Sequence, residues 1–448
     1  MRISISLPPL LEGVFRSLKG LLGEAYLVGG AVRDLVLGLS PKDLDFATPL
    51  PPEEVARRLG EAGLPVGLAG ARFGTVYTAV PVGGTVLDVE VTTFRTEVYN
   101  AGRKPRVGWA SSLLEDLARR DFTINAMALG GDGVVIDPFG GLEDLRQGLV
   151  RAVGDARARF EEDPLRVVRA LRFAARYGWR VEEATLRAAR ELAFLVGRKV
   201  SAPRFAEEAT KGLLAPGAEG FVRGLFELGV WYDFLPELVG PHGPAHLLLQ
   251  NPLHHPEGDV AAHLAQVAGR AVLLAREAGV DASLAAWAGF LHDVGKPQTA
   301  QPTPEGWYRF PGHDVLGAEM IPGIARRLGW SRAWEEALVA TTRLHMRVLQ
   351  PPTPRAVRRL QAEAGSHLSL LRLVCMADGE GRREDLEAWF RVESPVEPLL
   401  RGRDLLALGL KPGPELGRLL RKAYELQLEL GLKTKEEVLE ALGLAAPA

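Results

Sequence analysis

The sequence predicts an α/β domain built on a small mixed sheet, followed by a mostly α-helical remainder. Apolar runs with the alternation typical of β-strands are confined to about the first 145 residues, and helical patterns prevail from Val153 onward. The chain has 448 residues. Because a single hydrophobic core stops growing at roughly 250–300 residues, we expect more than one domain.

The composition is that of a globular protein, and it restricts where a nucleic-acid surface can lie. Hydrophobic residues make up 47% of the chain and charged residues 25%, which is ordinary for folded domains. The formal net charge is −2, so a surface that binds nucleic acid must be a local basic patch. Cys375 is the only cysteine, which excludes an intramolecular disulfide and fits a reducing compartment. We expect a cytoplasmic protein without a membrane span, because neither a signal-peptide pattern nor an apolar run of about 18 residues is present.

Two glycines and two aspartates within residues 27–48 form the first candidate site. Gly29 and Gly30 follow a short apolar run, and Asp43 and Asp45 open a second one. In a strand, residues two apart project from the same face, and two neighbouring carboxylates repel each other unless a cation lies between them. Magnesium prefers oxygen ligands and accepts phosphate as a further ligand, while glycines let a backbone approach a phosphate closely. Each pair alone is typical of a turn or a solvated loop, but together they indicate a metal-dependent site for a nucleoside triphosphate.

The next runs predict a β-hairpin that adds a third carboxylate. Residues 73–80 are rich in β-formers, residues 81–84 form a turn, and residues 86–93 alternate in polarity. Asp88 and Glu90 share one face of the second strand, so Glu90 can approach the aspartate pair. The alternative is that both residues are the solvated face of an edge strand.

Residues 114–128, with the sequence LEDLARRDFTINAMA, supply the candidate phosphate contacts. Arg119 and Arg120 are placed to face a triphosphate, and Asn125 follows Asp121 by about one helical turn. The alternative is a surface helix with an ordinary charge cluster.

The helical region contains an acid–base pair at helical spacing. Asp163 and Arg166 are three residues apart, which predicts one helical face, and Arg169, Arg172 and Arg176 extend a basic stripe. A paired aspartate and arginine form a planar donor–acceptor array that can read the edge of a base. The alternative is an exposed ion pair of little energetic consequence.

Histidines and aspartates beyond a Pro/Gly/His-rich boundary form a second candidate site. Imidazole and carboxylate are suitable ligands for a divalent transition metal, although a single His-Asp pair is often a helix cap or a buried polar pair. We assign His254 and His255 to the boundary. The candidate ligands are His263, His292, Asp293, His313, His345 and Asp378.

These motifs, taken in order, resemble those of a known family. GGAVRD followed by KDLDFAT resembles the first motif of class II tRNA nucleotidyltransferases and the related bacterial poly(A) polymerases, which belong to the polymerase-β-like superfamily. ARRDFTINA resembles their second motif, and DPFGG followed by DL resembles the block that couples head to neck. EDPLR resembles the nucleotide-templating motif, and residues 201–208 resemble the closing block. AHLAQ, LHDVGK, GHDVLGAE, LHMR and MADGEGR occur in the order of HD-type metal phosphohydrolases, which many bacterial members carry after the neck.

The resemblance implies a polymerase-β-like nucleotidyltransferase head at 1–148, a helical neck and body at 149–243, an HD domain at 244–385, and a helical tail at 386–448 that contacts RNA. It implies that Asp43 and Asp45 hold Mg²⁺, that Glu90 assists catalysis, and that the HD ligands hold Mn²⁺, Ni²⁺ or Co²⁺, with His313 and His345 serving a second ion. The implied nucleotide-binding residues are Gly29, Gly30, Arg33, Arg120, Asp121, Asn125, Asp163, Arg166, Arg169 and Arg172.

The implied function is template-independent addition of CCA, or part of it, to tRNA 3′ ends from CTP and ATP. Family members that add only CC have a shortened loop between the first two motifs, and residues 95–112 of this chain, a basic segment predicted to be a loop, are almost full length. This length favours complete CCA addition. Poly(A) polymerase, A-only and CC-only activities are the alternatives, together with a reading from another class, an HD phosphohydrolase whose head only binds nucleotides.

Overall fold

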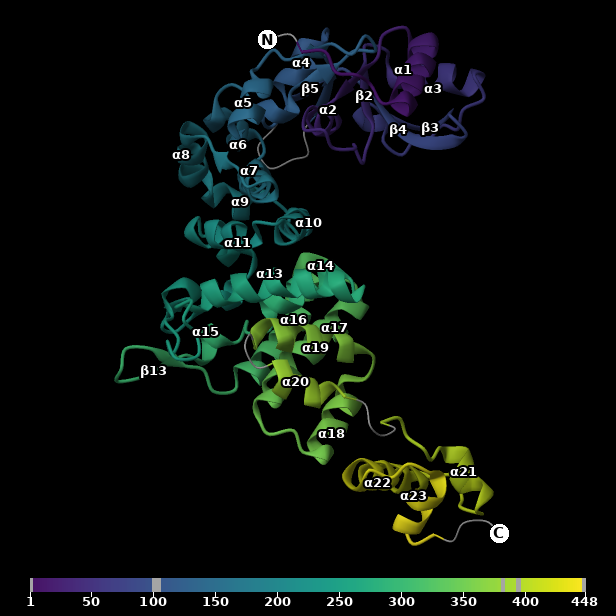
Figure 1. Cartoon of the computed structure of the whole chain (residues 1–448), viewed down its shortest axis with the longest axis vertical. Coiled ribbons are helices and arrows are strands. Elements are labelled where there is room, and N and C mark those ends of the chain that lie inside the picture. The colour runs from purple at the N-terminus through teal and green to yellow at the C-terminus, as the bar shows by residue number, and fades with distance from the viewer. Residues whose placement is uncertain (1–2, 99–105, 380–382, 392–395, 445–448) are drawn as a thin grey trace. The chain divides into compact units, whose positions relative to one another are not determined.

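The computed structural model describes residues 3–98, 106–379, 383–391 and 396–444 (Figure 1). The chain forms two compact units. The first comprises Met1–Glu208 with Leu228–Val230, and the second comprises Ala209–Glu227 with Trp231–Ala448. A mixed sheet lies in the first unit and most of the remaining chain is helical, as the sequence predicts. No helix in the described part of the chain is long and apolar enough to cross a membrane.

The sheet of the first unit has six strands in the order β3-β4-β2-β1-β7-β8. Strands β2 and β4 pair in parallel, and the other neighbours pair antiparallel. Both candidate carboxylate strands therefore lie next to each other inside the sheet. The strands are β1 (Tyr26–Val28), β2 (Asp45–Thr48), β3 (Thr75–Val82), β4 (Thr85–Thr93), β7 (Ala128–Leu129) and β8 (Val135–Ile136).

The predicted hairpin is present as β3 and β4, which pair from Thr75↔Thr92 to Val82↔Thr85. Its turn is narrower than expected, because it consists of Gly83 and Gly84, both with positive φ. Such turns suit the twist of a hairpin, and glycine adopts them without strain. Along β4, Val89 and Val91 are buried, whereas Glu90 is only partly buried. The alternation in sequence thus predicts the two faces of this strand correctly.

Helix α1 (Pro9–Leu22) covers part of this sheet together with α3 (Pro52–Glu61) (Figure 1). Val14, Leu18 and Leu22 are buried at helical spacing, and the Phe15 ring meets the Phe46 ring edge-on, with centroids 5.0 Å apart. Burying each of these side chains contributes about 1.5–3 kcal/mol. This packing holds β2 in place from the side of the sheet that carries Phe46.

The expectation of a loop over residues 95–112 is wrong at both ends of that segment. Strands β5 (Arg95–Val98) and β6 (Arg106–Trp109) pair antiparallel, with Arg95 opposite Trp109. Both segments carry β-branched or aromatic residues, which favour strands, but four residues are too few to show a clear period. Residues 99–105 lie outside the described residues.

The expectation that Asp163 and Arg166 share one helical face is also wrong. Asp163 adopts an extended backbone, with φ −137° and ψ 98°, between α6 (Ala156–Glu162) and α7 (Leu165–Tyr177). The residue before a proline avoids the helical region, and Pro164 follows Asp163. The Asp163 carboxylate instead accepts a hydrogen bond from the Leu165 backbone N–H at 3.2 Å, at the start of α7.

The other elements of the first unit surround the sheet or continue into helices, and α10 ends in the second unit. They are α2 (Gly30–Val36), η1 (Ala71–Phe73), α4 (Leu113–Ala118), η2 (Thr123–Asn125), α5 (Gly141–Gln147), β9 (Leu149–Val150), β10 (Arg180–Val181), α8 (Glu183–Leu192), α9 (Phe194–Lys199) and α10 (Ala202–Leu213).

The second unit is helical, and its core contains a cluster of large aromatic rings. Trp231 packs against Phe290 with centroids 4.4 Å apart, and it meets Trp287 edge-on at 6.0 Å. All three side chains are fully buried. Because Phe290 lies in α14 (Ala282–Leu291), directly before His292 and Asp293, this core fixes the position of the second candidate site.

The C-terminal helices pack around a small core of their own, made by Leu400, Leu405, Ala423, Val438 and Leu439. Gly409, Pro412 and Gly413 lie in the turn that precedes α22 (Pro414–Leu430). The remaining elements of this unit are α11 (Ala218–Glu227), α12 (Val230–Phe234), η3 (Pro236–Leu238), β11 (Val239–Gly240), β12 (Gly243–Pro244), η4 (Ala245–Leu247), α13 (Val260–Ala278), α15 (Lys296–Thr299), β13 (Gln301–Pro302), β14 (Tyr308–Arg309), α16 (His313–Leu328), α17 (Arg332–Leu344), η5 (His345–Leu349), α18 (Pro354–Ala364), η6 (Gly365–His367), α19 (Leu368–Asp378), α20 (Arg383–Phe390), α21 (Gly402–Ala407), α22 (Pro414–Leu430) and α23 (Lys435–Ala441).

Candidate functional site

Three carboxylates gather where β2 meets β4. Asp45 is the first residue of β2, and Glu90 is its register partner on β4, so both side chains project from the same face of the sheet. Burial raises the pKa of Asp45, and the Asp43 charge raises it further against the opposing effect of Arg120. Burial also raises the pKa of Glu90, as do the charges of Asp45 and Asp43. The negative charge collected here is what a hard divalent cation relieves, so the three residues fit a magnesium site.

The two glycines form a tight turn beside these carboxylates. Gly29 has φ +71°, and a Cβ atom on it would lie 2.7 Å from Nη1 of Arg120. Glycine is therefore required both by the backbone and by the arginine that crosses the turn. Nη2 of Arg120 donates to Asp116 at 3.2 Å, while its buried Nε has no hydrogen-bond partner among the described residues. Arg120 is thus a cation close to Asp45, and its Nε–H can donate a further hydrogen bond.

Arg33 lies close to Gly30 and makes hydrogen bonds and ring contacts with neighbouring side chains. It is 5% exposed, donates to Asn125 Oδ1 at 2.6 Å, and makes two hydrogen bonds to Asp34. Its guanidinium lies over the rings of Phe173 and Tyr177, at 5.4 and 5.3 Å. These contacts fasten α2 to α7.

Asp121 is the centre of a buried polar network. Its Oδ1 accepts hydrogen bonds from the Phe122 backbone and from Asn125, at 2.8 and 3.0 Å. Its Oδ2 accepts two from Arg169, at 2.5 and 2.9 Å. Burial alone would raise the pKa of Asp121, but the Arg169 charge and these bonds lower it to about 2. Asp121 is therefore an ionised carboxylate whose two oxygens are both engaged within the protein.

Glu208 completes this network, and the sequence analysis missed its role. One oxygen pairs with Arg169 at 3.2 Å and the other with Arg172 at 2.7 Å. Both Glu208 and Arg172 are buried, at 5% and 7% exposure, so the alternative of an exposed helix does not hold at Arg172. The only signal in the sequence was that Glu208 is the last residue of the closing block, residues 201–208.

The two residues expected to read a base have different partners in this structure. The Asp163 carboxylate pairs with Arg204 at 3.0 Å. Arg166 is 6% exposed, and it donates to Glu162 at 3.0 Å and to the Arg119 carbonyl at 2.9 Å. The first turn of α7 is therefore fastened to the residue that precedes Arg120.

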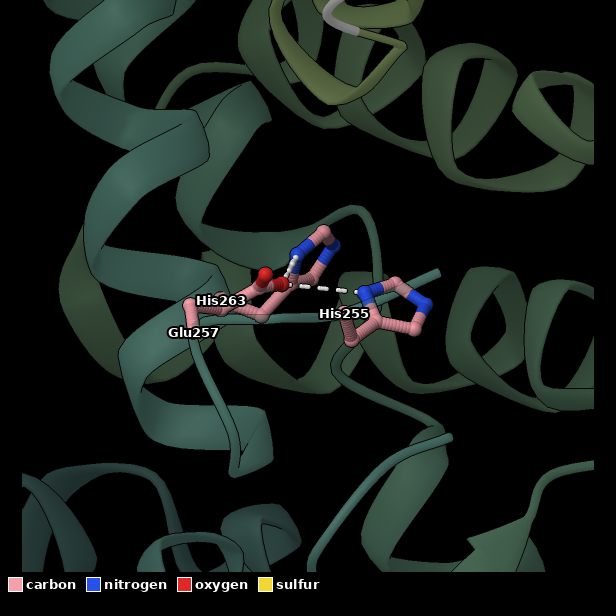
Figure 2. A group of neighbouring side chains, drawn as sticks. All are labelled: His255, Glu257 and His263. Carbon is pink, nitrogen blue, oxygen red and sulfur yellow. Dashed lines mark hydrogen bonds and ion pairs between the residues drawn. The ribbon is translucent and has the colours of Figure 1, made fainter. Parts of the chain in front are cut away.

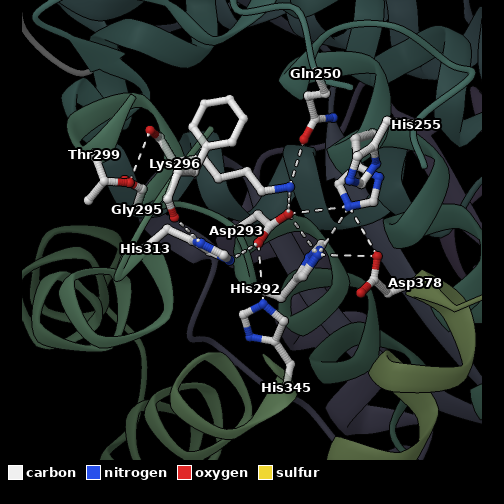
Figure 3. Close-up of polar contacts among 12 residues, drawn as sticks. Gln250, His255, His292, Asp293, Gly295, Lys296, Thr299, His313, His345 and Asp378 are labelled. Carbon is white, nitrogen blue, oxygen red and sulfur yellow. Dashed lines mark hydrogen bonds and ion pairs between the residues drawn. The ribbon is translucent and has the colours of Figure 1, made fainter. Parts of the chain in front are cut away.

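The histidine and aspartate ligands of the second site converge although their elements are far apart in sequence (Figure 3). His263 Nε2 lies 3.2 Å from Asp378 Oδ1, 3.3 Å from His292 Nε2 and 3.3 Å from Asp293 Oδ2. The other oxygen of Asp293 lies 2.9 Å from Nε2 of His313 and 3.3 Å from Nε2 of His345. All six predicted ligands thus share one site, with Asp293 between two groups of imidazoles.

In each of the four histidines, Nδ1 makes a hydrogen bond on the side of the ring that faces away from the centre of the site. His292, His313 and His345 donate to the carbonyls of Gly289, Phe310 and Thr342, at 2.8, 2.7 and 2.7 Å, and His263 donates to Glu257 at 2.7 Å (Figure 2). This arrangement leaves every Nε2 facing the centre, as in histidine metal sites.

Three buried atoms at this centre lack a hydrogen bond among the described residues: Asp293 Oδ1, His313 Nε2 and His345 Nε2. Buried polar atoms are rarely left without a partner, and these three face one another. Nitrogen and carboxylate ligands together suit a divalent transition metal, so the site fits one or two such ions.

The charges at this site are strongly coupled. Burial would lower the pKa of His263, but hydrogen bonds with Asp293, Asp378 and Glu257 raise it to about 10. The pKa of Asp378 is lowered despite burial, because His263 and His292 face it. A metal ion must therefore displace a proton from His263 near neutral pH.

Three further residues of this site escaped the sequence analysis. Lys296 Nζ pairs with Asp293 Oδ2 at 2.5 Å and donates to Gln250 at 2.6 Å. Glu257 binds His263, and His255, assigned to a domain boundary from sequence, lines the cavity in front of the centre. Lysine three residues after Asp293 was a usable signal, whereas the other two contacts depend on the fold of a loop.

The cavity has a volume of about 670 Å³. Four of the six candidate ligands line it: Asp293, His313, His345 and Asp378. The other lining residues include Leu253, His255, Trp307, Phe310, Met346 and Leu349. The cavity therefore offers more room than a phosphate group needs.

Comparison with known proteins gives three family matches. The model described as Poly A polymerase head domain matches residues 25–151, the HD domain matches residues 260–379, and the probable RNA and SrmB-binding site of polymerase A matches residues 178–239. The first match covers the carboxylate site, and the second covers the six histidine and aspartate ligands.

Two relatives match over nearly their whole length. The Multifunctional CCA protein of Halorhodospira halophila is 34% identical over 435 residues, which is 89% of this chain and 95% of that protein. The CC-adding tRNA nucleotidyltransferase of Thermus thermophilus is 34% identical over 438 residues, 92% of each chain.

Solved structures share the same fold. The CCA-adding enzyme of Bacillus stearothermophilus, solved in complex with CTP, superposes with a TM-score of 0.65 at 26% identity and 98% coverage of both chains. The CCA-adding enzyme of Thermotoga maritima, complexed with tRNA, gives a TM-score of 0.64 at 22% identity, covering 99% of this chain and 98% of that one.

Proposed function

Because this chain belongs to the family of tRNA nucleotidyltransferases that includes the CCA-adding enzymes, we propose that it adds CCA to the 3′ ends of tRNA from CTP and ATP. The observation that carries the proposal is the group of three carboxylates at the β2–β4 junction, beside Gly29 and Arg120. An enzyme that transfers nucleotides needs this combination of a cation site and a phosphate contact.

Asp43 and Asp45 are the residues that would hold magnesium, with Glu90 nearby. Magnesium bound there supplies activation of the RNA 3′-hydroxyl and charge neutralisation for the departing pyrophosphate. Arg120 contributes a positive charge next to the glycine turn, where a triphosphate can approach the backbone. Asn125 and Arg33 hold that turn in place through their hydrogen bond at 2.6 Å.

We assign the choice of base to Asp163 and Arg166. The support is their place at the start of α7, where Arg166 donates to the carbonyl of Arg119, so that a change in the first turn of α7 is transmitted to the triphosphate contact. Asp121, Arg169 and Arg172 keep α7 in position from within the protein. Residues 1–148 would then supply catalysis, and residues 149–243 would supply the choice of base. The tail at 386–448 would contact RNA.

One assay tests the product. A tRNA that ends before CCA is incubated with CTP alone, with ATP alone and with both. Complete CCA addition predicts two added residues with CTP, none with ATP alone, and three with both. Two additions under every condition that contains CTP would assign the CC-only activity that the Thermus thermophilus relative's name records, and a long product with ATP alone would assign a poly(A) polymerase.

A second activity, metal-dependent phosphoester hydrolysis in residues 244–385, is favoured by the buried atoms at Asp293, His313 and His345 that lack hydrogen bonds. Manganese, nickel or cobalt bound there supplies a water acidic enough to act as a nucleophile near neutral pH. The substrates would be phosphomonoesters or 2′,3′-cyclic phosphates. Metal analysis of the full chain and release of phosphate or opening of the cyclic ester test this activity, and metal without turnover under any divalent ion would contradict it.

A further inference from the structure

The carboxylate site continues across the sheet to a tyrosine on β3. Asp45 is the register partner of Glu90, and Glu90 is the register partner of Tyr77, so the three residues form one row across β2, β4 and β3. Residues in such a row project from the same face of the sheet. Because neighbouring strands lie about 5 Å apart, the backbone of Tyr77 is roughly 10 Å from that of Asp45.

The two faces of this part of the sheet differ in what covers them. The neighbouring row consists of Phe46, Val91 and Val76, and all three side chains are fully buried, on the face against which α1 packs. Tyr77 projects from the opposite face and is 41% exposed. The row of Asp45, Glu90 and Tyr77 therefore lies on a face of the sheet that a substrate can reach.

Two glycines ahead of β3 leave room for the Tyr77 ring along one side. The Gly67 N–H donates to the Tyr77 carbonyl at 2.8 Å, and the Tyr77 N–H donates to the Gly67 carbonyl at 3.0 Å. A Cβ atom on Gly70 would lie 3.1 Å from Cε2 of Tyr77, and one on Gly67 would lie 3.1 Å from Cβ of Tyr77. Both distances are shorter than ordinary van der Waals contacts. Glycine at these two positions thus lets the ring rest on the preceding segment, while the remainder of the ring stays exposed.

The side from which the RNA approaches follows from the place of the triphosphate contacts. Gly29 and Arg120 lie beyond β1, which pairs with β2 on the side away from β4. In phosphoryl transfer the attacking and leaving oxygens are roughly in line, on opposite sides of the phosphorus atom. With the triphosphate on the β1 side, the attacking 3′-hydroxyl reaches the carboxylates over β4 and β3. Tyr77 is the exposed aromatic side chain in the row on that side.

We propose that the Tyr77 ring stacks on the base at the 3′ end of the RNA and thereby positions the terminal hydroxyl at Asp45 and Glu90. This proposal rests on the proposed nucleotide addition. Stacking on an aromatic side chain tolerates any base, because every base has an aromatic face. Such tolerance suits this reaction, since the terminal base changes with each nucleotide added. A side chain that recognised one base by hydrogen bonds would lose its partner at the next step.

The first test compares CTP addition to two RNAs: a tRNA ending before CCA, and the same tRNA whose last nucleotide keeps its ribose and 3′-hydroxyl but lacks its base. Stacking predicts that the wild type favours the intact RNA by about 5–100-fold in kcat/KM. Tyr77→Leu keeps an apolar side chain without a ring, and it is expected to lose about fivefold or more of that preference, with an unchanged KM for CTP. Tyr77→Phe keeps the ring and should restore the preference.

The matched control for this test is Val86→Ala. Val86 lies on the same face of β4 as Glu90, four residues before it, and is 62% exposed, so this variant should keep the wild-type preference. A preference in Tyr77→Leu equal to that of the wild type would overturn the stacking contact. An equal loss in Tyr77→Phe would do so as well, because it would assign the effect to the hydroxyl.

The second test detects the contact without nucleotide addition. The last base of the tRNA is replaced by 2-aminopurine, whose fluorescence is quenched by stacking, and the RNA is bound to the full chain without CTP. We expect stronger quenching by the wild type and Tyr77→Phe than by Tyr77→Leu at saturating protein. Equal fluorescence in the wild type and Tyr77→Leu would overturn the contact. If the wild type extends neither RNA in the first test, the proposed addition is overturned, and the fluorescence still decides whether Tyr77 stacks on the RNA end.

Discussion

The two candidate sites differ in how far their carboxylates are paired with positively charged or hydrogen-bonding groups of the protein. At the β2–β4 junction, Asp45 and Glu90 are partly buried and Asp43 is exposed. The three acidic side chains repel one another, and Arg120 opposes this repulsion at Asp45. At the centre around Asp293, every acid faces a histidine or lysine, and each imidazole is held from behind. Under the proposed function, cation and triphosphate would complete the first site, whereas the residues of the second site already face one another. This difference suits one site that releases a growing RNA end and another that would hold its metal throughout.

The largest expected effect comes from variants of the carboxylate site at the β2–β4 junction, which should lose nucleotide addition and keep the second site intact. Asp43→Ala or Asp45→Ala should lower nucleotide addition by about a thousandfold or more, because the cation loses an oxygen ligand. Mn²⁺ binding by the second unit should stay unchanged. Asp88→Ala is the matched control, since Asp88 lies on the same strand but is exposed. Normal addition by either variant would remove the basis of the proposed function.

Variants of the histidine and aspartate site should affect hydrolysis and leave nucleotide addition unchanged. His292→Ala or Asp293→Asn is expected to abolish hydrolysis and to reduce bound metal below one ion per chain, because Asp293 lies between both groups of ligands. Addition to tRNA should proceed at the wild-type rate. Loss of addition in a variant that keeps its thermal stability would show that the two activities are not separable.

Arg166 distinguishes selection from binding within the first unit. Arg166→Ala should change the preference for CTP over ATP by about tenfold or more while RNA affinity changes little, because its guanidinium lies at the start of α7 and a good base contact is worth about 1–3 kcal/mol. The measurement is kcat/KM for each nucleotide together with the Kd for tRNA. A weaker Kd with unchanged preference would assign Arg166 to the basic surface.

The coupled charges at the second site predict how its metal affinity depends on pH. The pKa of His263 is raised to about 10 from its ordinary value, so the metal-free ring is protonated at neutral pH and its proton must leave before the metal binds. Between neutral pH and that pKa, affinity should rise about tenfold per pH unit. Titrations of Mn²⁺ at several pH values measure the slope. A flat profile would mean that His263 is neutral before the metal arrives.

Glu90 carries the smallest expected effect. Glu90→Ala should lower the rate of addition clearly, by about tenfold, because a partly buried carboxylate beside Asp45 contributes to the cation site without forming its core. The rate at saturating nucleotide measures it. Unchanged kinetics would return Glu90 to the solvated face of its strand.

The sequence predicts best those features that depend on residue type at short, fixed spacing. The glycine turn and the hairpin that carries Glu90 are of this kind, and the mixed sheet and helical remainder follow from periodicity. The expectation that Asp43 and Asp45 share one strand is wrong, because β2 begins at Asp45 and Asp43 lies before it. Prediction from the sequence also fails at Asp163, because the proline after it overrides the helical spacing, and at the short paired strands β5 and β6, where four residues cannot establish a period.

Contacts made by tertiary folding are also beyond the reach of a single sequence. Glu257 meets His263 and His255 only because the 250–259 loop folds back before α13. Glu208 neutralises Arg169 and Arg172 across almost 40 residues of chain. In both cases the residue type is ordinary and only its place in the fold gives it a role.

The most direct test of the account is nucleotide addition to a tRNA ending before CCA, measured side by side for the wild type, Asp45→Asn and Asp293→Asn. Asp45→Asn keeps the size of the side chain and removes only its charge. We predict three added residues with CTP and ATP for the wild type and for Asp293→Asn, and none for Asp45→Asn. Addition by Asp45→Asn at the wild-type rate would contradict the placement of catalysis at the β2–β4 junction.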